Sequence, residues 1–94
     1  MGLESIELPG DVASVRTTPR FTTESVPAGL LAAHRLAAGV WGVLRVHQGT
    51  VAFVLEQSQD RRELGIGEQQ VIRPEGLHHV EPGPGAAFDV EMFR

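Results

Sequence analysis

Residues 41–56 read WGVLRVHQGTVAFVLE and contain two runs that are rich in Val, Leu and aromatic residues. Such runs favour β-strands. We expect one strand over residues 41–46 and another over residues 50–56, joined through the HQG segment as a β-hairpin. Alternate positions share a face, and both faces of the second strand are apolar: one carries Val51, Phe53 and Leu55, the other Ala52 and Val54. This pattern predicts a strand that is covered on both sides.

Outside this region, glycine and proline divide the chain into short segments. The dense spacing of turn residues is typical of an all-β sandwich or barrel and leaves little room for long helices. We expect a polar turn at QSQDRR, strand structure around Val71 and Ile72, and a last strand in AAFDVEMFR, residues 86–94. In that last strand Phe88, Val90 and Met92 share one face, and Asp89, Glu91 and Phe93 share the other. Residues 1–94 form a single domain in this interpretation.

The segment GLLAAHRLAAG, residues 29–39, follows a different pattern. It consists of Ala, Leu and Arg, which are strong helix formers. Local propensity alone predicts a helix of about three turns, a length that needs tertiary contacts to be stable.

The composition excludes several classes of protein. Twelve acidic residues against eight basic ones, all of them arginine, give a net charge of −4, and the longest basic run is Arg61-Arg62. We therefore expect no nucleic acid partner. The absence of cysteine excludes disulfides and thiolate chemistry. The longest apolar region is interrupted by His34 and Arg35 and falls short of the roughly 20 residues that span a membrane. Because the N-terminus lacks the pattern of a secretion signal, a cytoplasmic location is expected.

The four histidines are the main candidates for chemistry. His47 lies in the expected turn, where a histidine is usually solvated. His34 interrupts an apolar stretch, which is typical of a hydrogen-bonded core histidine or of a ligand. His78 and His79 are consecutive, so in a strand they point to opposite faces. Pro74, Gly76 and His79 fit the short pattern Pro-x-Gly-x-x-His that is typical of cupins.

A longer order of motifs is more specific. The succession TTPRFTTESVPAGLLAAH, GVWGVLRVHQGTVAF, IRPEGLHHVEP and FDVEMF resembles the TehB/YeaR-like family of small cupin-type β-barrels, over roughly residues 9–94. The resemblance implies a cupin-like double-stranded β-helix, a small jelly-roll barrel, in which residues 29–36 form a strand. It also implies a metal held by His34 and His78, with Glu91 on the last strand as the candidate third ligand.

Two imidazoles and one carboxylate suit a divalent transition metal (Zn, Fe, Ni or Mn) and leave open positions for water or a small ligand. Side chains that could orient the imidazoles are Gln69, Gln70 and Glu81. The chain departs from the family pattern at Leu77, where an aromatic residue is usual. It also lacks the methyltransferase that follows this domain in one branch of the family, so a stand-alone domain is expected.

These observations predict a cupin-like protein that binds one divalent metal inside the barrel, together with a small molecule or anion. The resemblance connects it with tellurite resistance or with the response to nitrate and nitric oxide. A metalloenzyme, either an Fe(II) dioxygenase or an isomerase, is one alternative, and a metal-free structural or dimerisation module is another. The apolar second face of residues 50–56 predicts a homodimer. Between the paired histidines, alternation with Val80 favours His78 as the inward ligand, and places His79 with Glu81 on the outer face.

Overall fold

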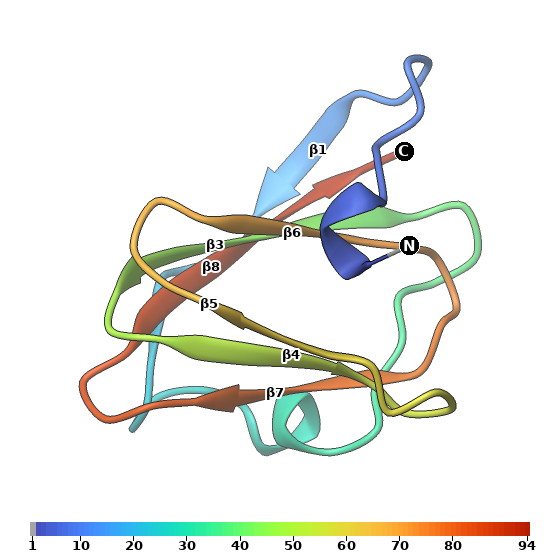
Figure 1. Cartoon of the computed structure of the whole chain (residues 1–94). Coiled ribbons are helices and arrows are strands. Elements are labelled where there is room, and N and C mark those ends of the chain that lie inside the picture. Colours follow the sequence, from blue (N-terminus) through green and yellow to red (C-terminus); the bar gives the residue numbers. More distant parts are fainter. Residues whose placement is uncertain (1) are drawn as a thin grey trace.

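The computed structural model describes residues 2–94, and these fold into eight strands in two antiparallel sheets (Figure 1). The all-β class is therefore confirmed. The strands are β1 Ser14–Thr17, β2 Phe21–Thr22, β3 Trp41–Gln48, β4 Val51–Leu55, β5 Arg61–Leu64, β6 Gln69–Ile72, β7 His78–Pro82 and β8 Ala87–Phe93. Two short 3-10 helices, η1 Leu3–Ser5 and η2 Ala28–Leu31, complete the elements.

The larger sheet has the strand order β1-β8-β3-β6, with β2 also paired to β8, and the smaller sheet has the order β5-β4-β7. The two sheets lie one above the other in Figure 1. Within residues 2–94 no strand pairing closes them into one barrel. None of the helices in this part of the chain is both long and apolar enough to cross a membrane.

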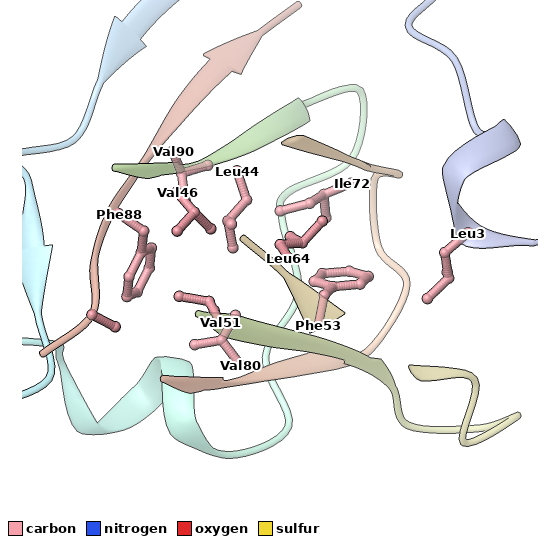
Figure 2. Close-up of a cluster of buried hydrophobic side chains, with 11 residues drawn as sticks. Leu3, Leu44, Val46, Val51, Phe53, Leu64, Ile72, Val80, Phe88 and Val90 are labelled. Atoms are coloured by element: carbon pink, nitrogen blue, oxygen red, sulfur yellow. The ribbon is translucent and has the colours of Figure 1, made fainter. Parts of the chain in front are cut away.

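Side chains from both sheets fill the space between them (Figure 2). In the larger sheet Leu44 lies opposite Val90 and Val46 opposite Phe88, and all four are buried. Other members of the core are Val51, Phe53, Leu64, Ile72 and Val80. The shared face predicted for Phe88 and Val90 on the last strand is thus confirmed, and the structure shows that it packs in the core. Burial of this apolar surface is the main stabilising contribution to such a fold.

The predicted hairpin of residues 41–56 is wrong, although both strands exist. β3 pairs with β6 and β8, whereas β4 pairs with β5 and β7. Both edges of each strand are therefore occupied by other strands, and the tight connection carries the chain from one sheet to the other. Gly49 makes this turn with φ of +64°, and a Cβ atom there would lie 3.0 Å from the Cα of Ala86.

The segment 29–39 is neither the helix that propensity predicts nor the strand over residues 29–36 that the resemblance implies. It contains only the last part of η2, followed by a single β-bridge between His34 and His78. Leu30 and Leu36 pack separately against the core. Packing of these two leucines, together with the bridge at His34, determines the path of the segment in place of local propensity.

The second face of β4 is covered, as predicted, because Ala52 and Val54 are only 2% and 4% exposed. The cover comes from charged residues of the same chain. On this face Ala52 lies between Glu63 and Glu81, and Val54 between Arg61 and His79. Arg61 on β5 bonds Glu81 on β7 at 2.6 Å, so this ion pair spans β4. The homodimer stays a prediction, but the apolar face on which it was based needs no partner.

Candidate functional site

His78, the first residue of β7, lies between the sheets. Its side chain shares the inner face with Leu55 and Val80, and the residue is only 3% exposed. Nδ1 lies 3.0 Å from the carbonyl oxygen of Gly76. Since a carbonyl only accepts hydrogen bonds, Nδ1 carries the proton and Nε2 carries the free lone pair.

Burial determines the charge of this ring. Loss of hydration lowers the pKa of His78 below its ordinary value. The hydrogen bond to the Gly76 carbonyl raises the pKa, and the neighbouring His34 and His79 lower it further. The neutral imidazole therefore predominates at pH 7. A neutral imidazole with a free Nε2 is the form that binds metal ions.

Backbone hydrogen bonds hold His34 next to His78. Its N–H donates to the His78 carbonyl at 2.8 Å, and the His78 N–H donates back to the His34 carbonyl at 2.8 Å. The two rings meet edge to face, with 5.4 Å between their centroids and an interplanar angle of 89°. Within residues 2–94 the His34 ring and Nε2 of His78 make no hydrogen bond to protein.

His78 lines two cavities. One has a volume of about 280 Å³ and is lined by His34, His78 and mainly apolar side chains, among them Phe21, Leu30 and Met92. The other, of about 240 Å³, is lined by His78 with Phe53, Leu77 and Arg73. The two histidines thus present their rings to a small, largely apolar space.

Glu91 is not brought to these histidines. It lies on the face of β8 opposite to Val90 and Met92, where its carboxylate bonds Arg45 at 2.7 Å. Hydrogen bonds from Ser14 and from Arg45 lower the pKa of Glu91. The carboxylate therefore lies on the opposite face of the larger sheet from Val90 and Met92, which line a cavity together with His34 and His78. Among residues 2–94 no group of three His, Asp or Glu side chains is arranged to hold a metal ion.

His79 points outward, as alternation predicts. Nε2 bonds the carboxylate of Glu81 at 2.8 Å, and Nδ1 bonds the carboxylate of Glu56. These two carboxylates, Glu81 foremost, raise the pKa of His79. The structure therefore shows an outer-face network of Glu56, His79, Glu81 and Arg61.

The other side chains considered in the sequence, His47, Gln69 and Gln70, form hydrogen bonds away from His34 and His78. His47 lies within β3 and not in a turn, and its Nε2 bonds Asp89 at 2.9 Å. Gln70 is buried and donates to the Leu3 carbonyl at 2.9 Å, while Gln69 contacts Arg45. The group that orients His78 is a backbone carbonyl, that of Gly76, which side-chain chemistry in the sequence did not reveal.

A profile of the TehB-like domain family matches residues 16–91, which is most of the chain. The chain belongs to this family. A comparison with curated protein sequences gave no significant match. The TehB-like fold is also seen in two solved structures with low sequence identity.

One is the crystal structure of a protein from E. coli strain K12, with a TM-score of 0.87 and 22% identity, covering 95% of this chain and 96% of that chain. The other is TehB from Haemophilus influenzae, with a TM-score of 0.79 and 19% identity, covering 89% of this chain and 32% of that chain. At such identities the two structures establish a shared fold. The chain corresponds to about a third of TehB.

Proposed function

We propose that this TehB-like domain binds one divalent transition metal ion between its sheets through His34 and His78. The observation that carries the proposal is the arrangement of His78. Its buried, neutral ring donates from Nδ1–H to the Gly76 carbonyl, its Nε2 makes no hydrogen bond among residues 2–94, and its centre lies 5.4 Å from the centre of the His34 ring. Metal-binding histidines are typically oriented in this way by a hydrogen bond from the second ring nitrogen.

The separation of the rings supports the same proposal. Two imidazoles on one zinc ion, with Zn–N bonds of about 2.0–2.1 Å and a tetrahedral angle, have ring centres about 5 Å apart. The rings of His34 and His78 are 5.4 Å apart. Glu91 is not part of this proposal, because its carboxylate lies on the outer face of β8.

Two protein ligands leave several coordination positions for water and for a small ligand. The adjoining cavity of about 280 Å³ has room for such a ligand. In this proposal the two sheets correspond to a cupin-like double-stranded β-helix, and the domain acts as a stress-response or sensing module. Membership of the TehB-like family suggests a link to tellurite resistance.

The test is the metal content and thermal stability of protein purified without chelators, with Zn, Fe(II), Ni and Mn added separately. A metal that binds only the native state stabilises it by about 2.7 kcal/mol at a concentration of 100 times Kd. For a domain of this size that free energy corresponds to a rise in Tm of about 10 °C or more. Less than about one-tenth equivalent of metal, with no rise in Tm, contradicts the proposal.

His78→Asn and His34→Asn are the informative variants. The asparagine amide reaches the place of Nδ1 and can still donate to the Gly76 carbonyl, so His78→Asn removes Nε2 while the local hydrogen bond is retained. Both variants should lose the metal-dependent rise in Tm. His47→Asn, on the outer face of the larger sheet, is the matched control and should keep it.

The second candidate is a metal-free structural or dimerisation module. It is supported by the lack of a third His, Asp or Glu beside the two histidines within the described residues 2–94. In that case His34 and His78 serve only to join the segment after η2 to β7. The test of this candidate is the molar mass of the metal-free protein measured by light scattering. The mass of a dimer, reduced to that of a monomer by surface substitutions, would favour this candidate.

A further inference from the structure

Three arginines surround a concave surface on the outer side of His34. Arg16 is on β1, Arg35 follows His34, and Arg94 follows β8. The hollow that they line has a volume of about 540 Å³. β1 and the end of β8 are held together by the reciprocal backbone hydrogen bonds of Ala13 and Arg94, at 3.0 and 3.2 Å. We use the name arginine hollow for this concave surface together with the side chains of Arg16, Arg35 and Arg94.

The three guanidinium groups of the arginine hollow lack an ion-pair partner among the described residues 2–94. Arg45 and Arg61 form ion pairs with Glu91 and Glu81, but none of the three arginines of the hollow forms an ion pair among residues 2–94. The whole chain carries a net charge of −4. Three like charges at one hollow of an acidic protein repel each other, and a bound anion offsets this repulsion.

The walls of the arginine hollow are apolar and include Leu36, Val40 and Met92. A volume of about 540 Å³ lies within the range of small-molecule sites, about 300–1,000 Å³, and exceeds what an inorganic oxyanion alone would fill. Guanidinium groups match the geometry of carboxylate and phosphate oxygens, with two parallel hydrogen bonds. From this combination we infer that the arginine hollow binds a small organic oxyanion, a carboxylate or phosphate on an apolar body.

This site is separate from the proposed metal site, although His34 lines both. The oxyanion group would contact Arg16, Arg35 and Arg94, and the apolar body would lie on Leu36 and Met92. No metal is needed for these contacts. The inference therefore stands or falls independently of metal binding, and it is tested with EDTA present.

The probes are phenyl phosphate, benzoate, inorganic phosphate and neutral benzyl alcohol, each titrated into the full chain and followed by NMR of the backbone amides. We expect saturable shifts at residues 15–17, 34–40 and 92–94 with phenyl phosphate or benzoate, and weaker binding of inorganic phosphate. The stronger of the two organic anions identifies the oxyanion group. Binding should weaken as salt is added, since the guanidiniums are exposed.

Arg16→Gln and Arg35→Gln should each weaken binding by about tenfold, as expected for the loss of one charge-assisted hydrogen bond. Arg20→Gln is the matched control, because Arg20 is exposed, forms no ion pair among the described residues and lies outside the hollow. It should change affinity less than about twofold. Equal weakening by Arg20→Gln or equal binding of benzyl alcohol would overturn the inference. So would a lack of binding in EDTA that is reversed when the EDTA is replaced by a divalent metal.

Discussion

His34 and His78 exchange two backbone hydrogen bonds of 2.8 Å, although 43 positions of chain lie between them. The exchange fixes the two backbones as a hydrogen-bonded antiparallel pair, and in such a pair both side chains leave on the same side. The rings therefore meet at the end of the core, 5.4 Å apart. This bridge is the one contact of the segment after η2 with β7 that is made in strand geometry.

The pH dependence of stability should report the outer-face network. The pKa of His79 is raised in the folded state by Glu81 and Glu56, so folding favours the protonated ring. The stabilisation is fully present below the unfolded value of about 6.5 and is lost as pH rises through the higher folded pKa. The free energy of unfolding of the wild type minus that of His79→Gln should therefore be larger at pH 6 than at pH 9. A difference that is constant across this range would show that the ring is not charged when paired.

The turn between the two sheets should be sensitive to a side chain. Gly49→Ala introduces a Cβ atom 3.0 Å from the Cα of Ala86 at a φ of +64°, so both backbone strain and a steric contact arise. We expect a loss of about 1–3 kcal/mol in the free energy of unfolding, measured by denaturant titration. Gly67→Ala is the matched control, with φ of +83° and open space around the new Cβ. If Gly67→Ala costs as much as Gly49→Ala, the contact with Ala86 contributes nothing.

The buried amide of Gln70 should hold the N-terminal segment in place. It donates to the Leu3 carbonyl at 2.9 Å, and Leu3 belongs to the core (Figure 2). The Leu3 carbonyl also accepts from the Ile6 N–H at 3.2 Å, so Gln70→Ala removes one of its two hydrogen bonds, at a cost of about 0.5–1.5 kcal/mol. In this variant, amide hydrogen exchange should become faster in residues 3–6, while exchange in β3 should change less. Gln69→Ala removes a side chain that accepts an exposed hydrogen bond from Arg45, and it should leave the exchange of residues 3–6 unchanged.

Strand alternation was the most reliable guide in the sequence. It separated the inward His78 from the outward His79, and it put Phe88 and Val90 on one face, which is buried in the structure. The same rule put Glu91 on the face opposite Met92, which is where the structure has it. The metal ligand set implied by the resemblance therefore conflicted with the alternation of the last strand.

The pairing between strands could not be predicted from the local sequence in this way. β3 and β4 are consecutive and apolar, so a hairpin is the simplest local arrangement, but β6 and β8 occupy the edges of β3. These partners lie more than 20 residues away, and nothing in the local sequence marks them. Likewise, the Ala and Leu residues of segment 29–39 have helix propensity, while its path depends on the distant bridge to β7.

The central claim is that His34 and His78 bind one metal ion through ring nitrogens, His78 through Nε2. Its most direct test is the ¹⁵N chemical shift of the four imidazoles during titration with zinc. We predict that Nε2 of His78 and one ring nitrogen of His34 shift together and saturate near about one equivalent, while His47 and His79 stay unchanged. Saturation at His47 or His79, with the nitrogens of His78 unmoved, would contradict the claim.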